Sequence, residues 1–272
     1  MVTANETFDI SAEQAERYEA DLVRAGQGLA ARALVKAAGV AAGHRVLDVA
    51  CGTGQVTRVV ADTVGPRGFV VGADLNENML GVARRLYPGI IWQHADAVHL
   101  PFRDEDFDVV LCEEGLSYFP VPGAALREMA RVLRPAGRIG IQVAAELAVQ
   151  PGYGPWIEMI AAEAGNAAAD LPRCYFQYGD LEILIPFFAA ANLRIEQARS
   201  WSGSWLFPSV AEMVRSEIED TPLRDRISAS QYERILTRSH DILAPYVSER
   251  GVDIPWRWLV VTATKRGGEA LG

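Results

Sequence analysis

Residues 46–55 read VLDVACGTGQ, an apolar run that contains one acid, Asp48, and ends in two glycines separated by a single residue. A strand that ends in G-x-G and opens a helix presents bare backbone N–H groups beside a helix N-terminus, which suits a negatively charged ligand group. Gly52 and Gly54 would let that ligand approach the backbone closely. The dinucleotide-binding fingerprint has a third glycine that this sequence lacks, so the turn alone is also compatible with a tight connection that binds nothing.

Two further acids follow the next two predicted strands. Asp74 lies 20 residues after Gly54, where an acid can accept hydrogen bonds from both hydroxyls of a ribose. Asp96, in the segment HADA, can accept a hydrogen bond from an exocyclic amine such as that of adenine. Asp48 can order the glycine turn or meet an ammonium group. Each acid alone could be a solvated strand-end residue, but together they indicate a ligand with a ribose, an adenine and an amine.

A sheet must bring these residues to one edge, and the apolar pattern predicts one. Short apolar runs, typical of buried parallel strands, occur over 45–50, 69–75, 90–96, 107–113 and 138–144. Helical spacing lies between most of them, at Met79, Val82, Ala83 and Leu86 and again at Leu126, Met129, Ala130 and Leu133. This alternation predicts an α/β fold, a parallel sheet with helices on both faces.

The flanking regions follow other patterns. Before the sheet, Leu29, Ala33, Leu34 and Ala37 share a helical face, and Gly39 is a plausible C-terminal stop. After it, 193–201 and 256–265 are predicted to be strands that complete the sheet. The predicted division is 1–145 for N-terminal helices and the ligand-binding core, 146–186 for a cap segment, 187–208 for a core strand, 209–250 for a helical cap segment and 251–272 for the last strand and tail.

The bulk composition disfavours several classes of protein. The net charge of −9 argues against a nucleic-acid binder or a binder of anionic membranes, since phosphate contacts need clustered Lys and Arg. Three scattered cysteines without C-x-x-C spacing argue against a disulfide framework or a Cys-rich zinc site. No basic, then apolar, leader opens the sequence, and no apolar run approaches the ~18 residues of a membrane span. We therefore expect a cytoplasmic protein, either a monomer or a homodimer.

Four motifs in order resemble those of class I S-adenosylmethionine-dependent methyltransferases. They are VLDVACGTGQ, GADLNENML, ADAVHLPFRDEDFDVVLCEEGLSYFP and LREMARVLRPAGRIGIQV. Within that class, they resemble the ubiquinone/menaquinone-biosynthesis-like branch of bacterial small-molecule methyltransferases. The resemblance is tight over about residues 40–145 and loose over 186–265. It implies a Rossmann-like, seven-stranded methyltransferase sheet with a mostly helical cap, and S-adenosylmethionine as cofactor, with S-adenosylhomocysteine as product.

The resemblance also implies roles for the matching residues. Around the methionine part of the cofactor it implies Ala50, Cys51, Gly52 and Gly54, with the backbone of Glu113 facing the ammonium. Around the adenosine part it implies Asp74 on the ribose, Leu75 and Met79 against the adenine or ribose, and Asp96 and Ala97 at the adenine edge. Tyr18 resembles a tyrosine that covers the cofactor. The chain departs from the common pattern at Ala50, where many relatives have glycine, and at Ala136, in a turn.

Catalysis by this class mainly needs an aligned acceptor and the exclusion of water, because the methyl group sits on a sulfonium. Glu113, Glu114 and Tyr118 are the candidate catalytic residues, although Glu113 can serve through its backbone and Tyr118 as a pocket wall. Among the four histidines only His240 is a candidate for a role near substrate, and no metal is expected. Because the carboxylate of Asp74 should face the crevice, its loss is expected to leave folding nearly unaffected.

The expected reaction is methyl transfer to the oxygen, carbon or nitrogen of a small, partly apolar metabolite in a biosynthetic route. Aromatic residues crowd the two cap segments and favour a bulky acceptor. One alternative is a cyclase or other non-methylating enzyme that keeps the cofactor pocket, since fold does not fix function. A nicotinamide-dependent oxidoreductase is disfavoured by the missing third glycine and by Asp96. A non-catalytic cofactor-binding partner protein is a further alternative.

Overall fold

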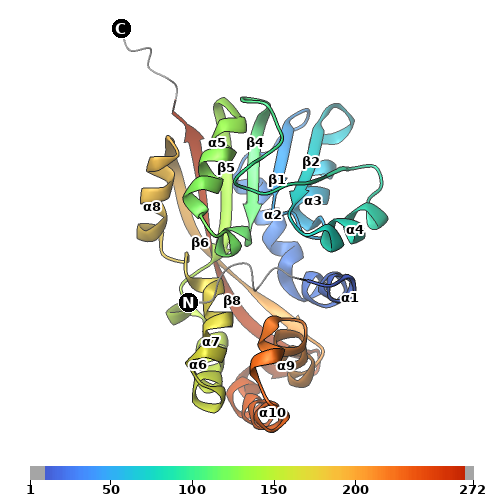
Figure 1. Cartoon of the computed structure of the whole chain (residues 1–272), viewed down its shortest axis with the longest axis vertical. Helices are drawn as coiled ribbons and strands as arrows, with labels where there is room; N and C mark the ends of the chain where they lie inside the picture. The colour runs from blue at the N-terminus through green and yellow to red at the C-terminus, as the bar shows by residue number, and fades with distance from the viewer. Residues whose placement is uncertain (1–9, 267–272) are drawn as a thin grey trace.

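A single mixed sheet runs through the computed structural model, which describes residues 10–266 (Figure 1). Its order is β3-β2-β1-β4-β5-β8-β6, with the short β7 paired to β8. The strands are β1 Arg45–Val49, β2 Phe69–Asp74, β3 Ile91–His94, β4 Phe107–Glu113, β5 Leu133–Ala144, β6 Leu193–Phe207, β7 Val247–Ser248 and β8 Gly251–Lys265. Strands β1 to β5 are parallel, and β8 runs antiparallel to β5 and β6. The predicted α/β architecture is confirmed.

Helices cover both faces of the sheet. They are α1 Ala12–Arg17, a π-helix Tyr18–Gln27, α2 Gly28–Ala37, α3 Gln55–Val64, α4 Glu77–Leu86, α5 Pro122–Val132, α6 Tyr153–Ala164, α7 Asn166–Arg173, α8 Leu181–Ala190, α9 Val210–Glu219 and α10 Ala229–Leu243. Residues of α2 and α3 pack on one face of the sheet, and residues of α5 and α8 pack on the other. The first nine residues of the predicted N-terminal segment, and residues 267–272 of the predicted tail, lie outside the described residues.

The last two strands are longer than the sequence predicts. Each of β6 and β8 has 15 residues, and their paired ends continue beyond the core, as the lower half of Figure 1 shows. On this extension a second apolar core forms, in which Trp205, Phe207 and Ile254 pack with residues of α6, α7, α9 and α10. The cap is therefore built on the sheet itself, so the sheet fixes how the cap sits over the edge where the glycine turn lies.

Two predicted helical faces are corrected by the structure. Leu29 is 65% exposed, whereas Ala31, Leu34, Val35 and Ala38 are buried against the sheet, so the buried face of α2 is rotated from the predicted one. The predicted stop is confirmed, because Gly39 has φ +68° just beyond α2.

The helix predicted through Leu133 ends one residue earlier. Helix α5 ends at Val132, and Leu133 already pairs with Phe107 as the first residue of β5. Leu133 is buried in either conformation, which is why helical spacing alone includes it. Ala136 lies in the loop-like start of this strand with φ +59°, a conformation that favours glycine.

Candidate functional site

The glycine turn lies where β1 ends and α3 begins. Ala50 has φ +58° and Gly52 φ +54°, so the chain passes twice through the left-handed region within three residues. A Cβ on Gly52 would have one neighbour within 4 Å, the Cε1 atom of Tyr18 at 4.0 Å, so this stretch of backbone borders open space. Gly52 is therefore placed for the close approach that the sequence predicts.

Packing in the fold gives a second reason for glycine at position 54, besides the predicted approach of a ligand. A Cβ on Gly54 would lie 2.3 Å from Cη2 of Trp92, and the residue has φ +93°. The indole of Trp92 also closes over Gly72, where a Cβ would lie 2.5 Å from the ring. Packing of the turn against this indole already requires glycine at position 54, whether or not a ligand approaches it.

Asp74, at the end of β2, is bound into the turn. Its Oδ2 accepts a hydrogen bond from the backbone N–H of Gly52 at 2.7 Å, and its Oδ1 accepts one from Asn76 at 2.8 Å. The residue is 2% exposed, and burial raises its pKa against the three backbone N–H groups that lower it. Both oxygens accept hydrogen bonds from backbone N–H groups, which gives this carboxylate a place in the fold that the sequence did not indicate, and we now expect its loss to lower stability.

Three acids gather behind the turn, and Asp48 is the most deeply buried of them. Its Oδ2 accepts a hydrogen bond from Thr57 at 2.6 Å, while its Oδ1 has no hydrogen-bond partner. Burial raises the pKa of Asp48 to about 7, the hydrogen bond from Thr57 lowers it, and the charge of Asp74 raises it again. A buried carboxylate oxygen without a partner is unfavourable, and a hydrogen-bond donor on a ligand would satisfy it.

Glu113 is the last residue of β4, Glu114 follows it, and both line the same space. Oε1 of Glu113 accepts from Gln142 at 2.8 Å, and Oε2 of Glu114 accepts from the backbone of Ala144 at 3.1 Å, while Oε1 of Glu114 is buried without a partner. Burial, then Glu114, then Asp48 raise the pKa of Glu113 well above its usual range. Burial raises that of Glu114 to about 8. No lysine, arginine or histidine lines this part of the described structure, so the three acids favour a cationic ligand group.

The residues predicted to meet adenine line a neighbouring hollow. Leu75, Asp96 and Ala97 border it, together with Val49, Ala50, Asp74, Ala95, Tyr118, Phe119 and Pro120. The Oδ1 of Asp96 accepts from the N–H of Val98 at 3.0 Å, which holds the loop that carries the acid. Half of Leu75 is exposed, so it offers an apolar surface to a planar ring. The structure thus brings these three predicted residues together.

The N-terminal helices cover the turn. Tyr18 opens the π-helix and lines the cavity beside Gly52, and Met79 of α4 is buried against it. Glu19 accepts hydrogen bonds from Thr53 at 2.5 Å and from Arg58 at 3.0 Å, which ties the π-helix to the turn and to α3. We call residues 10–27 the N-terminal lid.

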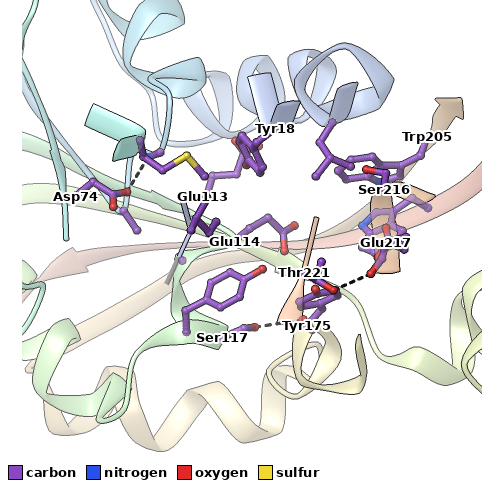
Figure 2. A pocket seen from close by; sticks show the side chains of 18 of the residues that line it. Tyr18, Asp74, Glu113, Glu114, Ser117, Tyr175, Trp205, Ser216, Glu217 and Thr221 are labelled. Atoms are coloured by element: carbon purple, nitrogen blue, oxygen red, sulfur yellow. Dashed lines mark hydrogen bonds between the residues drawn. The ribbon is translucent and has the colours of Figure 1, made fainter. Parts of the chain in front are cut away.

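A cavity of about 150 Å³ runs from the turn into the cap (Figure 2). Asp74 lies at one end, Glu113 and Glu114 in the middle, and Glu217 at the other end, as Figure 2 shows. Tyr118 lines the middle, 6.1 Å from Tyr175 between ring centroids, and burial raises its pKa well above 10.

The cap contributes residues that sequence reasoning did not single out as site residues. They are Ser216, Glu217, Thr221, Tyr153, Tyr175, Trp205 and Trp256. The sequence places Tyr153, Tyr175 and Trp205 among the aromatic residues of the cap and Trp256 in the last predicted strand, whereas Ser216 and Glu217 belong to an ordinary amphipathic pattern on α9. His240, the one histidine considered for substrate, is exposed on α10 and does not line the cavity.

A metal site and a membrane-spanning helix would each need features other than those of the cavity. Within residues 10–266, no three histidine, cysteine, aspartate or glutamate side chains are grouped so that they could hold a metal ion. Within the same residues, no helix has the length and apolar character that a membrane crossing requires.

Residues 47–141 match the family model described as a methyltransferase domain. The demethylmenaquinone methyltransferase of Lactobacillus johnsonii is 42% identical over 108 residues, which are 38% of this chain and 44% of that protein. The ubiquinone/menaquinone biosynthesis C-methyltransferase UbiE of Ectopseudomonas mendocina is 46% identical over 114 residues, 40% of this chain and 44% of that protein. The matched part spans less than half the length of these relatives.

Solved structures match most of the chain at low identity. The YcgJ protein of Bacillus subtilis has a TM-score of 0.58 and 21% identity over 88% of this chain and 99% of its own. The 4+2 cyclase SpnF has a TM-score of 0.56 and 19% identity over 89% of this chain and 81% of its own. A SAM-dependent methyltransferase of Aquifex aeolicus has a TM-score of 0.54 and 18% identity over 70% and 92%. Residues 47–141 are therefore similar to methyltransferase domains, and the chain shares the Rossmann-like fold of these solved structures.

Proposed function

We propose that this protein binds S-adenosylmethionine and transfers its methyl group to a small, partly apolar metabolite held under the cap. The observation that carries the proposal is the cluster of Asp48, Glu113 and Glu114 behind the left-handed turn at Gly52, with no basic side chain lining it. S-adenosylmethionine brings an ammonium and a sulfonium, both cationic, to such a site. The names of the relatives agree with this activity.

The residues fit the cofactor in three ways. The buried Oδ1 of Asp48 and Oε1 of Glu114 lack partners, and an ammonium group supplies donors. Gly52 leaves the space that a cofactor backbone contact needs, and a side chain would fill it. The hollow bordered by Leu75, Asp96 and Ala97 takes a planar ring with an exocyclic amine, and Asp74 stands between the two parts.

When bound, S-adenosylmethionine supplies a methyl group on an already activated sulfur. The chain then needs to hold the acceptor in line and keep water out. Tyr18 and the N-terminal lid close one side, and Tyr118 and Tyr175 form the wall across from it. The pKa values of Glu113 and Glu114 are raised, so either carboxyl can be protonated at neutral pH. A protonated carboxyl is not available as a general base. Alignment is therefore the main contribution that we propose for these residues.

The acceptor atom stays open between carbon, oxygen and nitrogen. The two relatives named above are a ubiquinone/menaquinone biosynthesis C-methyltransferase and a demethylmenaquinone methyltransferase, but their similarity covers only 38–40% of this chain. A second candidate function is cyclisation without methyl transfer, since the SpnF cyclase shares the fold over 89% of this chain.

The test is incubation of the protein with S-adenosylmethionine carrying a deuterated methyl group and a metabolite extract from the source cells, followed by mass spectrometry. Methyl transfer predicts a product heavier by one labelled methyl group and a matching amount of S-adenosylhomocysteine. A product formed without consumption of S-adenosylmethionine would support the cyclase and contradict our proposal. The variant Gly52→Val serves as the inactive control.

A further inference from the structure

The cap end of the cavity has polar groups that the cofactor does not explain. Glu217 and Ser216 come from α9, Tyr153 from α6, and Trp205 and Trp256 from the extended ends of β6 and β8. Figure 2 shows Glu217 at the end of the cavity opposite Asp74. The inference below rests on the proposed function, because this end becomes the acceptor chamber once the cofactor fills the other end.

Glu217 is a buried acid without a cationic partner. Its Oε1 accepts a hydrogen bond from the hydroxyl of Tyr153 at 2.7 Å. Burial raises the pKa of Glu217 to about 7, the hydrogen bond from Tyr153 lowers it, and the charge of Asp220 raises it. None of the described residues that line the cavity is lysine, arginine or histidine, whereas four of these described residues are acids: Asp74, Glu113, Glu114 and Glu217.

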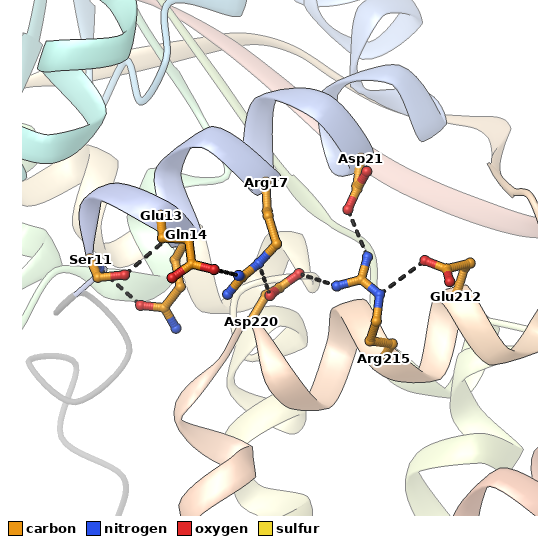
Figure 3. A network of polar contacts seen from close by, with 8 residues as sticks. All are labelled: Ser11, Glu13, Gln14, Arg17, Asp21, Glu212, Arg215 and Asp220. Carbon is orange, nitrogen blue, oxygen red and sulfur yellow. Dashed lines mark hydrogen bonds and ion pairs between the residues drawn. The ribbon is translucent and has the colours of Figure 1, made fainter.

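Two arginines near the cap end of the cavity form ion pairs with other acids. Arg17 pairs with Asp220 at 2.5 Å, and Arg215 pairs with Asp21 at 2.8 Å and with Asp220 at 3.3 Å (Figure 3). Figure 3 shows this network joining the N-terminal lid to α9. The acid inside the cavity is thus left for a ligand to neutralise.

Three donors of the same chamber also lack partners. The hydroxyl of Ser216, which is 2% exposed, and the indole N–H groups of Trp205 and Trp256 are buried and make no hydrogen bond. Unpaired buried donors are costly, so a ligand atom that accepts a hydrogen bond is expected beside them.

Aromatic rings form the walls of this chamber. Tyr153 and Trp256 meet edge to face with centroids 4.7 Å apart, and Trp205 lies 5.4 Å from Trp256. Such walls suit a ring on the ligand and also attract a cation through their faces.

We propose that the methyl acceptor is an amine that carries an aromatic ring and an oxygen, with the amino group on an alkyl carbon and therefore protonated at neutral pH, and that Glu217 anchors this ammonium group at the cap end of the cavity. Glu217 is a specificity-determining residue in this assignment, and the acceptor atom lies nearer to Glu113 and Glu114. A neutral alcohol would donate one hydrogen bond to Glu217 without the charge, so it binds more weakly. A carboxylate would enter a cavity lined by four acids, so it binds weakest.

Three probes that share a 4-hydroxyphenyl ring test the assignment: tyramine, tyrosol and 4-hydroxyphenylacetate. They are titrated by calorimetry into protein saturated with S-adenosylhomocysteine at about pH 7.5, where the amine and the carboxylate are charged. We expect tyramine to bind about tenfold more tightly than tyrosol, as a charge-assisted hydrogen bond predicts, and 4-hydroxyphenylacetate to bind weakest. Equal binding of all three, the reverse order, or no binding of tyramine would overturn the assignment.

Variants assign the preference to one side chain. Glu217→Gln should bring tyramine and tyrosol within about threefold of each other, while Glu212→Gln, which removes the same charge from a residue of α9 paired with Arg215, should leave the preference intact. If Glu217→Gln does not fold, Tyr153→Phe leaves the carboxylate in place and should keep the amine preference; its loss there would contradict the proposal. Failure of S-adenosylhomocysteine to bind would instead count against the proposed function.

Discussion

Replacement of Asp48 by asparagine should strengthen the folded protein and weaken its hold on the cofactor. The amide keeps the shape of the side chain, and its oxygen can still accept the hydrogen bond from Thr57. What it removes is a carboxyl that is 1% exposed and whose second oxygen has no partner. The carboxyl of Asp48 therefore destabilises the folded protein when no ligand is bound, and a bound cation reduces this destabilisation.

The magnitude follows from the pKa of Asp48. Burial raises it from 3.8 to about 7, which corresponds to about 4 kcal/mol of destabilisation once the group is ionised. Because the folded-state pKa lies above the unfolded value, this penalty is absent below about pH 4 and grows as the pH rises to about 7. Some of the gain in Asp48→Asn is offset by the unpaired amide, so we expect about 1–3 kcal/mol of added stability at about pH 8 and almost none at about pH 4.

Urea unfolding at the two pH values measures the stability difference, and calorimetry measures affinity for S-adenosylmethionine. We expect the affinity to fall at least about tenfold, because a charge-assisted contact to the ammonium is lost. A variant that is less stable than wild type at the higher pH, or that binds S-adenosylmethionine unchanged, would refute the reasoning about this acid.

Five further variants extend the test. Asp74→Ala should lower stability by about 2–4 kcal/mol in urea unfolding, because two backbone N–H groups lose their acceptor, and should weaken S-adenosylmethionine binding in calorimetry; normal stability would show that water replaces the carboxylate. Gly52→Val should abolish binding while circular dichroism keeps its helical signal, although φ +54° adds strain of about 1–2 kcal/mol. Glu113→Gln and Tyr118→Phe should each lower turnover less than about tenfold with an unchanged pH profile, and a thousandfold loss in either would identify a general base. Arg17→Met should loosen the N-terminal lid from α9 and speed dissociation of S-adenosylhomocysteine in stopped flow; an unchanged rate would show that the ion pair does not hold the lid.

The sequence predicts the cofactor half of the molecule because its signals are local. The G-x-G turn, the acid 20 residues beyond it and the apolar runs between them all lie within short windows, and β1, β2 and β4 form where these windows predict them. Hydrogen-bond partners that lie far apart in the sequence cannot be predicted from such local signals. Nothing near Asp74 in the sequence indicates that its oxygens bind Gly52 and Asn76, because those contacts exist only once the turn closes.

The cap half was predicted only in outline. The strand predicted over 193–201 stops before the stretch SGSWLF, yet this stretch extends β6 through pairing with the far end of β8. Glu217 lies in VAEMVRSEIE with two other acids and one basic residue, so its spacing is that of any surface helix. Only the packing of α9 against the aromatic extension makes it a cavity residue.

Gly54 gives the opposite lesson. The motif predicts a glycine for close approach to the cofactor, and the glycine is there, but Trp92 from β3 already fills the space that a side chain would need. A residue type that fits two physical demands cannot be assigned to one of them from its spacing alone. The neighbouring Gly52, which borders open space, is the residue that can answer the question about the ligand.

The most direct measurement of the central claim is a calorimetric titration of the purified protein with S-adenosylhomocysteine, with NAD as the competing ligand. The ammonium group of S-adenosylhomocysteine can donate to the unpaired carboxylate oxygens of Asp48 and Glu114. Its adenosine fits the hollow bordered by Asp96. We predict a single site with a dissociation constant on the order of micromolar, lost in Gly52→Val, and no heat from NAD. Binding of NAD without binding of S-adenosylhomocysteine would contradict the account.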